Sequence, residues 1–155
     1  MEIERKFKPS SLPADLDSYP VRIIEQGYLS TDPVLRVRRD GDEYYLTYKG
    51  AGLLSREEYN LPLTEASYRH LLEKADGTVI RKRRVVIPLE GGTEKRSIEL
   101  DLFDAPFEGL IIAEVEFGSE EEAKAFTPPA WFGEEVTYDP RYHNSWLSSH
   151  PGLPE

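Results

Sequence analysis

Apolar and polar residues alternate along much of this chain, which is the pattern of half-buried β-strands. In the first seven residues, MEIERKF, this alternation places Glu2, Glu4 and Lys6 on one face of a strand. Similar patterns, rich in β-branched or aromatic residues and flanked by turn residues, recur along the sequence. They predict strands at about residues 2–7, 22–30, 34–39, 43–49, 55–61, 79–88, 96–103 and 111–117.

Helical patterns are fewer and shorter than the strand patterns. The stretch TEASYRHLLEKADG has apolar residues on one helical face, with Thr64 as the N-cap and Gly77 as the stop. In SEEEAKAF, the spacing of Ser119 and Glu122 is that of a capping box. Asp139-Pro140 favours a last short helix, because proline suits a first helical turn, and residues 13–18 form a further short turn.

The turns between strands indicate how the strands connect. Asp40-Gly41 and Gly91-Gly92 are typical of hairpins, so we expect antiparallel neighbours. The 155 residues suit one domain, residues 1–155, because no repeat or flexible linker divides them. Eight strands are also enough to close a small barrel.

Composition excludes several classes of protein. The chain has no cysteine, which rules out disulfide scaffolds and thiolate chemistry. Its net charge of −10, from 19 Lys and Arg against 29 Asp and Glu, opposes charge-driven binding to nucleic acids or anionic membranes. It has neither an N-terminal signal-like apolar run nor an apolar stretch of about 18 residues. We therefore expect a cytoplasmic protein with no nucleic-acid or membrane partner.

One face of the predicted strands is charged almost throughout. An antiparallel sheet often has one wet face, which would explain charges on any single strand. Several strands here carry nearly one sign of charge, however, and like charges placed side by side destabilise a sheet. The face comprises Glu2, Glu4, Lys6, Arg36, Arg38, Thr47, Lys49, Arg56, Glu58, Asn60, Lys82, Arg84, Glu99, Asp101, Glu114 and Glu116.

A closed barrel with this face inside would need ligands. Two carboxylates about 6 Å apart repel each other by roughly 3 kcal/mol at an effective dielectric constant near 20. Desolvation adds several kcal/mol for each ion. Divalent cations would neutralise the acidic residues and a polyanion would neutralise the basic ones. Acids and bases in one cavity therefore indicate a metal-bound phosphate chain.

The ordered set of charged motifs resembles a known family. MEIERKF carries an E-x-E-x-K signature, and LRVRR, YLTYKG, SREEYNL, IRKRRVVIP, IELDLF, GLIIAEVEF and GEEVTYDPRYHNSWL follow it in order. The chain resembles the CYTH domain, or triphosphate tunnel metalloenzyme, family over nearly its whole length. The resemblance implies an α+β, mainly β, fold: a closed eight-stranded antiparallel β-barrel that forms a tunnel, with a few short helices packed outside and at the C-terminus.

The resemblance also implies roles for individual residues. Metal ligands for Mg²⁺ or Mn²⁺ would be Glu2, Glu4 and Glu116, joined by Glu114 or Asp101. The phosphate-binding residues would be Lys6, Arg36, Arg38, Lys49, Arg56, Lys82 and Arg84. The catalytic residues would be Glu2, Glu4, Lys6, Glu58 and Lys82. Asn60 departs from the family, which often has an acid there, and Arg81 and Arg83 should face outward.

The expected reaction is metal-dependent hydrolysis of a triphosphate. We favour inorganic tripolyphosphate, cleaved to pyrophosphate and phosphate, because no segment is evident that would hold a base or a thiamine ring. The alternatives are a thiamine or nucleoside triphosphatase, a class IV adenylyl cyclase, and a polyphosphate-binding module without turnover. Tyr28 and Tyr45 could stack on an organic group, but packing is the commoner role of strand aromatics. We expect no metal role for His70, His143 or His150.

The C-terminal segment allows three arrangements. Its aromatic and apolar residues include Trp131, Phe132, Trp146 and Leu147. A helix here could pack against the barrel, plug one mouth of the tunnel, or meet a second subunit. Packing is the default for aromatics at helical spacing, and small members of the family are often homodimers.

Overall fold

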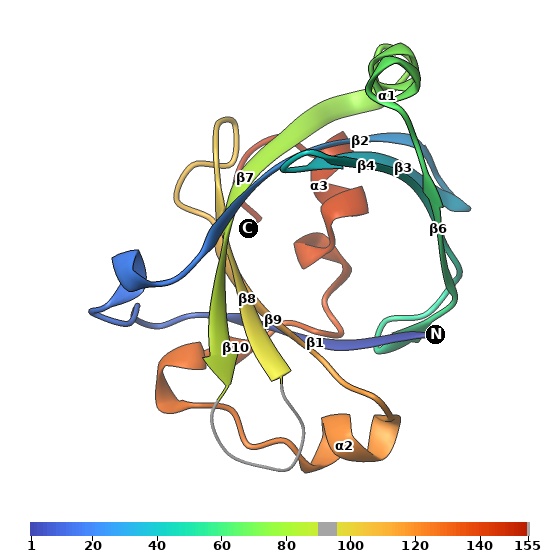
Figure 1. Ribbon diagram of the computed structural model, residues 1–155. Helices are drawn as coiled ribbons and strands as arrows, with labels where there is room; N and C mark the ends of the chain where they lie inside the picture. Colours follow the sequence, from blue (N-terminus) through green and yellow to red (C-terminus); the bar gives the residue numbers. More distant parts are fainter. Residues whose placement is uncertain (90–95, 155) are drawn as a thin grey trace.

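The computed structural model describes residues 1–89 and 96–154. Among these residues, ten strands form one antiparallel sheet that curls into a nearly closed barrel (Figure 1). The strands follow the order β10-β1-β9-β8-β7-β2-β3-β4-β6 around the barrel. Their bounds are β1 (Glu2–Lys8), β2 (Val21–Thr31), β3 (Val34–Asp40), β4 (Glu43–Lys49), β5 (Ser55–Arg56), β6 (Glu58–Pro62), β7 (Asp76–Leu89), β8 (Arg96–Phe103), β9 (Ile111–Glu116) and β10 (Glu134–Glu135).

The short strand β5 closes the ring. It pairs with β1 through Glu2 opposite Arg56 and Ile3 opposite Ser55, whereas β6 pairs with β4. The single strand expected at residues 55–61 is therefore wrong, because the chain changes partner at Glu57. Together, β5 and β6 correspond to one of the eight predicted strands. All eight predicted strands are present in the structure. Strand β10 was not predicted. The predicted hairpin at Gly91-Gly92 lies outside the described residues.

The helices lie where capping signals place them, although one ends early. In α1 (Glu65–Leu72), Thr64 Oγ1 accepts a hydrogen bond from the Ser67 N–H. In α2 (Glu120–Ala125), Ser119 Oγ accepts one from the Glu122 N–H, which confirms the predicted cap. Helix α1 was expected to run to Gly77, which is wrong, because the chain already pairs with β2 from Asp76 onward.

The remaining helical segments are short. Helix α3 spans Asn144–Ser149, and three-residue 3₁₀ turns occur at Leu16–Ser18, Ala130–Phe132 and Pro140–Tyr142. The last predicted helix is thus divided at His143, whose backbone is extended. Within the described part of the chain, no helix combines the length and the apolar character needed to cross a lipid bilayer.

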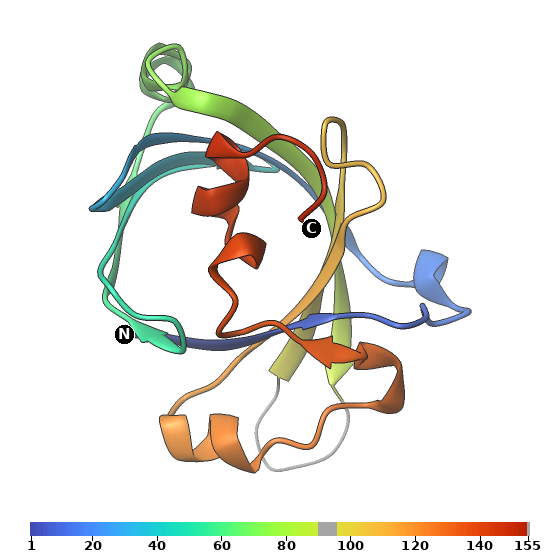
Figure 2. The ribbon, with the colours of Figure 1, turned by 180° about the vertical axis from the view of Figure 1, so that it is seen from behind.

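Outward-facing apolar residues on one side of the barrel form the larger core. Ile3 and Phe7 on β1 are buried together with Val115 on β9 and Leu100 on β8. The segment that contains α2 and residues 130–132 covers them from outside the ring, as Figures 1 and 2 show. Phe132 is fully buried in this core. The alternation predicted from the sequence is therefore right: apolar residues face out toward the covering segment, and charged residues face in.

A second apolar cluster lies inside the barrel. Helix α3 is drawn within the ring in both opposite views (Figures 1 and 2). Leu147 on this helix and the preceding Tyr142 are buried against side chains of the barrel strands. These barrel residues are Tyr28, Val34, Ile80, Phe103 and Ile112. The C-terminal segment therefore divides: residues 130–132 pack outside the barrel, whereas the part from Tyr142 onward packs inside it, with residues 143–145 facing the charged interior.

Candidate active site

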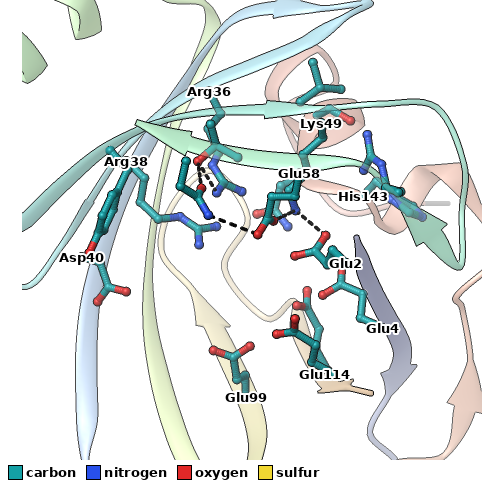
Figure 3. A pocket seen from close by; sticks show the side chains of 18 of the residues that line it. Glu2, Glu4, Arg36, Arg38, Asp40, Lys49, Glu58, Glu99, Glu114 and His143 are labelled. Carbon is teal, nitrogen blue, oxygen red and sulfur yellow. Dashed lines mark hydrogen bonds and ion pairs between the residues drawn. The ribbon is translucent and has the colours of Figure 1, made fainter. Parts of the chain in front are cut away.

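The charged face encloses a cavity of about 310 Å³ inside the barrel. Every site residue predicted from the sequence lines this cavity, except Asp101. Figure 3 shows Arg36, Arg38 and Lys49 on one side, with Glu4, Glu114 and Glu99 across from them. The cavity thus has an acidic wall, defined as Glu2, Glu4, Glu99, Glu114 and Glu116, and a basic wall, defined as Arg36, Arg38, Lys49, Lys82 and Arg84.

Strand register builds the acidic wall. In the pairing of β1 with β9, Glu4 lies opposite Glu116 and Lys6 lies opposite Glu114. In the pairing of β9 with β8, Glu114 lies opposite Glu99. Directly opposite residues in an antiparallel pair have neighbouring side chains on the same face. Three adjacent strands therefore bring carboxylates together.

Crowding of like charges shifts the protonation of this wall. Burial and the carboxylates of Glu2 and Glu4 raise the pKa of Glu116 to about 7. Burial and then the charge of Glu114 raise the pKa of Glu4. Proton uptake is favoured where negative charge is not compensated. The wall therefore has a deficit of positive charge that a cation could fill.

Lys6 compensates part of the acidic wall. Its Nζ atom lies 2.7 Å from Glu114 Oε1 and 3.2 Å from Glu4 Oε1. Burial alone would raise the pKa of Glu114, but Lys6 and Arg84 outweigh it, so this pKa is well below its usual value. Lys6 is therefore an internal counter-ion of the acidic wall. An anion that binds Lys6 would compete with Glu114 for its ammonium group.

On the basic wall, Arg36 and Arg38 have no carboxylate partner within the described residues. Arg36 donates to Thr47 Oγ1 over 3.3 Å, and its buried Nε has no hydrogen-bond partner there. Arg38 Nε donates to Gln26 Oε1 over 2.7 Å. Burial, and then the charges of Arg36 and Arg84, lower the pKa of Arg38 to about 9. Two guanidinium groups beside a cavity, without counter-ions, form a strong anion site.

Lys49 connects the basic wall to the acidic one. Its Nζ atom lies 2.8 Å from Glu2 Oε1 and 3.6 Å from Glu58 Oε2. Burial would raise the pKa of Glu58, but hydrogen bonding with Glu2 and the charge of Lys49 lower it overall. Arg56, whose Nε donates to Gly50 O over 3.0 Å, lines the cavity nearby. Glu58 thus lies in its charged form near Lys49, in the same cavity as Arg56.

Asp101 lies behind the cavity wall. It is fully buried; its Oδ2 is 2.7 Å from Lys82 Nζ, and Arg84 donates to both of its oxygens over 2.8 and 2.9 Å. Arg84 and Lys82 overcome the effect of burial and lower the pKa of Asp101. Burial, together with the charges of Arg84 and Arg38, lowers the pKa of Lys82 to about 7. Both oxygens of Asp101 are thus occupied by cationic donors.

Several lining residues were absent from the predicted site. Glu99 lies on the charged face and could have been found from the alternation alone. His143, Asn144 and Ser145 come from the C-terminal segment, where no strand pattern indicates which side faces inward. Gln26, fully buried on β2, contacts this group through its amide. The missed residues of the C-terminal segment therefore belong to a part of the site that tertiary packing assembles, whereas others, such as Asp40 and Glu99, lie on strands.

The other predicted positions behave as follows. Arg81 and Arg83 are exposed, as expected, and Tyr28 and Tyr45 both line the cavity. His143 is buried, with its Nε2 atom 3.2 Å from Thr137 O. Burial, and then the charge of Lys6, lower its pKa to about 4. The imidazole of His143 is therefore neutral at ordinary pH.

The acidic wall has the donor chemistry of a hard divalent cation. Its potential ligands are carboxylate oxygens, which Mg²⁺, Mn²⁺ and Ca²⁺ prefer. Within residues 1–89 and 96–154, no three histidine or acidic side chains are arranged as a ready-made metal site. The raised pKa values of Glu4 and Glu116 nevertheless record the repulsion that a bound cation would relieve. The residues present fit such an ion in chemistry and in charge.

Comparison with known proteins agrees with this architecture. The family model described as the CYTH domain matches residues 1–142. An inorganic triphosphatase of Nitrosomonas europaea is 42% identical over 151 residues, covering 95% of this chain and 96% of that protein. An inorganic triphosphatase of Acetivibrio thermocellus is 40% identical, with coverage of 97% and 94%. A crystal structure of an inorganic triphosphatase superposes with a TM-score of 0.69 and 37% identity, covering 98% of this chain and 97% of that one. The chain belongs to the CYTH domain family.

Proposed function

We propose that this protein hydrolyses inorganic tripolyphosphate, with water cleaving a terminal phosphoanhydride bond to give pyrophosphate and orthophosphate. The observation that carries the proposal is the separation of charge across one cavity. Arg36 and Arg38 lack carboxylate partners within the described residues, and Glu116 across from them is surrounded by carboxylates. A polyanion with a divalent cation satisfies both walls at once. The inorganic triphosphatases that this chain resembles support the same choice.

The basic wall would bind and orient the phosphate chain. Arg36, Arg38 and Lys49 project into the cavity, where they can donate to phosphate oxygens (Figure 3). Lys6, Arg56, Lys82 and Arg84 complete the phosphate-binding set. Phosphoryl transfer depends mainly on in-line positioning and on stabilising charge on the equatorial oxygens. Fixed cations around the chain supply both.

The acidic wall would hold Mg²⁺ or Mn²⁺. Glu2, Glu4 and Glu116 are the proposed ligands, with Glu114 or Asp101 as a further one. A divalent cation held by these carboxylates would supply positive charge to offset that of the phosphate oxygens. Asp101 is the weakest member of this set, because its oxygens already accept from Lys82 and Arg84.

A carboxylate beside the phosphate-binding residues would orient the attacking water. Glu58 and Glu116 are the two candidates that line the cavity. Glu58 has the lowered pKa of a charged acceptor, whereas that of Glu116 is raised to about 7. We favour Glu58, because its lowered pKa keeps it ionised and able to accept a hydrogen bond from water, whereas Glu116 is one of the proposed metal ligands. Glu58→Gln should reduce kcat more than it changes KM.

The lining favours an inorganic substrate over an organic one. Val34, Tyr28 and Tyr45 are its apolar or aromatic members, and the other lining side chains are polar or charged. Ligand pockets for organic groups are usually lined mainly by apolar and aromatic side chains. The cavity therefore has little surface on which to bury a base or a thiamine ring.

A substrate panel tests the proposal. Tripolyphosphate, ATP and thiamine triphosphate would each be incubated with Mg²⁺, with Mn²⁺ or with EDTA, and phosphate, pyrophosphate and cyclic AMP would be measured. We expect orthophosphate from tripolyphosphate, and only with a divalent cation. Pyrophosphate and cyclic AMP from ATP would identify a cyclase instead. Tight binding of tripolyphosphate without turnover in any condition would identify a binding module.

Glu4→Gln provides the matched variant. It removes one carboxylate charge from the acidic wall with little change of shape, so metal-dependent phosphate release should be lost while the protein stays folded. Glu108→Gln makes the same chemical change at an exposed position outside the cavity and is the control. Full activity of Glu4→Gln would refute the assignment of Glu4.

A further inference from the structure

A chain of side-chain amides joins two cations of the basic wall. Gln26 on β2 is fully buried; its Oε1 accepts from Arg38 Nε over 2.7 Å, and its Nε2 donates to Asn144 Oδ1 over 2.9 Å. The same Asn144 oxygen accepts from Lys82 Nζ over 3.1 Å. Arg38 on β3 and Lys82 on β7 are thus linked through one amide from β2 and one from α3.

This hydrogen-bonding pattern has one self-consistent orientation. Arginine and lysine side chains only donate, so each must face an amide oxygen. The oxygen of Gln26 faces Arg38, which leaves the nitrogen of Gln26 to face the oxygen of Asn144. Reversing either amide would place N–H groups against a cation. The two amides therefore fix each other as well as the cations.

Apolar packing brings Asn144 to this position. Asn144 is the first residue of α3, and Leu147 one turn later is fully buried in the cluster inside the barrel. Tyr142, just before the helix, packs in the same cluster. The C-terminal segment is thus anchored independently of the charges, so Asn144 does not depend on Lys82 for its place.

The two linking residues, Gln26 and Asn144, carry uncharged amides. A carboxylate at either position would hold its cation more strongly, but it would cancel the positive charge that attracts a phosphate chain. An amide oxygen orients a cation and leaves the charge intact. Arg38 has no carboxylate partner within the described residues, and Gln26 is the side chain that holds its guanidinium. This arrangement keeps the charge of Arg38 available for an anion, whereas Lys82 also pairs with Asp101 over 2.7 Å and is held between Asp101 and Asn144.

We propose that Gln26 and Asn144 are positioning residues, which hold Arg38 and Lys82 in the geometry that the triphosphate anion meets. The inference rests on the proposed function, since it concerns the same substrate and the same cavity. It gives the C-terminal segment a role in the reaction, because Asn144 on α3 holds a cation of the neighbouring strand β7. Cations oriented before binding do not have to be ordered at the expense of binding energy from the substrate.

The test removes the acceptor and then restores it. Asn144→Leu has a similar size but no oxygen, so Lys82 and Gln26 lose their shared partner. We expect kcat/KM for tripolyphosphate to fall roughly 10- to 100-fold, as for a catalytic group displaced by about 1 Å. Asn144→Asp restores the acceptor and adds a negative charge to the cavity, so kcat should recover while KM rises. Ser149→Ala, on the exposed side of the same helix, is the control.

A double-mutant cycle tests whether the two amides act together. Gln26→Met removes the other amide with little change of volume. If the two amides act as one unit, the double variant Gln26→Met with Asn144→Leu should have a kcat/KM no lower than that of the poorer single variant, because the effects of coupled residues are not additive. Independent losses that multiply in the double variant would overturn the inference. A purely structural role would lower stability and leave kcat and KM unchanged in the folded protein.

Calorimetry with tripolyphosphate in EDTA separates this inference from the proposed function. Failure of the wild-type protein to release phosphate would end the proposal of hydrolysis, whereas weaker binding by Asn144→Leu would still support positioning. Kinetic constants and affinity of Asn144→Leu within twofold of wild type would overturn the inference. If Asn144→Leu does not fold, Asn144→Asp decides alone: preserved kcat with raised KM supports the inference, and loss of kcat overturns it.

Discussion

Replacing Asp101 with Asn tests how charge is balanced behind the cavity. The change removes one negative charge with almost no change in shape. Asp101 has no exposed surface, and it lies against Lys82 and Arg84, which are 1% and 5% exposed. After the substitution, Lys82 keeps its hydrogen bond to Asn144, and Arg84 keeps Glu99 at 3.0 Å. Lys82, whose pKa is about 7 even beside Asp101, then loses its proton more readily, so Arg84 carries the buried charge that is left poorly compensated.

The expected cost follows from the ion pairs that Asp101 makes. Arg84 donates twice to Asp101, over 2.8 and 2.9 Å, and Lys82 lies 2.7 Å away. Removing one partner of a buried ion pair typically destabilises a protein by about 3–5 kcal/mol, because the other charge stays buried and uncompensated. Asp101 has two cationic partners, which would favour a larger loss of stability. The oxygen of the new asparagine still accepts one hydrogen bond, however, so we expect the loss to stay within this range.

Urea unfolding in EDTA measures this loss, since no metal then contributes. Asp139→Asn is the matched control, because its ion pair with Arg141 over 2.6 Å is partly exposed and should contribute no more than about 1 kcal/mol. Saturating tripolyphosphate should stabilise Asp101→Asn more than wild type, because the anion replaces the missing charge. A loss below about 1 kcal/mol would refute this account of Asp101. If Asp101→Asn were instead more stable than wild type in EDTA and were no longer stabilised by Mn²⁺, Asp101 would be a metal ligand.

Three further predictions concern stability. Glu116→Gln should raise the urea midpoint at pH 8 in EDTA, because burial and neighbouring carboxylates raise the pKa of Glu116 to about 7 and its ionised form is therefore disfavoured in the folded protein; an unchanged or lower midpoint would contradict this. For His143, whose pKa is lowered to about 4, the unfolded chain binds more protons between pH 6.5 and 4. Acidification through this window should remove up to about 3 kcal/mol, and His143→Gln should flatten that part of the profile. Leu147→Ala should cost about 2–5 kcal/mol in urea unfolding, because this side chain is fully buried inside the barrel; a cost below about 1 kcal/mol would mean that the C-terminal segment does not stabilise the fold.

The alternation of residues was enough to predict the cavity walls. Strand geometry fixes which side chains share a face, whatever the neighbouring strands are. Glu2, Glu4 and Lys6 could therefore be assigned to the interior once the strands were expected to close into a barrel. The exchange of partners at Glu57 could not be predicted, because two residues of β5 are too few to show a period of their own.

The C-terminal contribution had a weaker signal in the sequence. Tyr28, Val34 and Ile80 lie on the same strand faces as the charged residues, yet they are buried and apolar. An interior that changes from charged to apolar along several strands must be covered at its apolar end. The sequence did not show which segment covers it, because the packing of α3 is tertiary. The place of Asn144 depends on that packing.

The order of strands explains which charges remain free for ligands. Acidic residues line the adjacent strands β1, β9 and β8, and basic residues line β7, β3 and β4. Opposite charges meet where the two sets adjoin: Arg84 pairs with Asp101 across β7 and β8, and Lys49 pairs with Glu2 on β1. They also meet at Lys6, which lies among the acidic residues of β1 and β9 and pairs with Glu114.

Away from these two junctions, Arg38 on β3 and Glu116 on β9 face neighbours of their own sign. Charges at the junctions stabilise the barrel, so neutralising them should mainly cost stability. Charges within each set repel one another when no ligand is bound, so neutralising them should spare stability and cost binding. The same charged lining thus divides into a part that holds the fold together and a part that is available to the proposed ligand, a metal-bound phosphate chain.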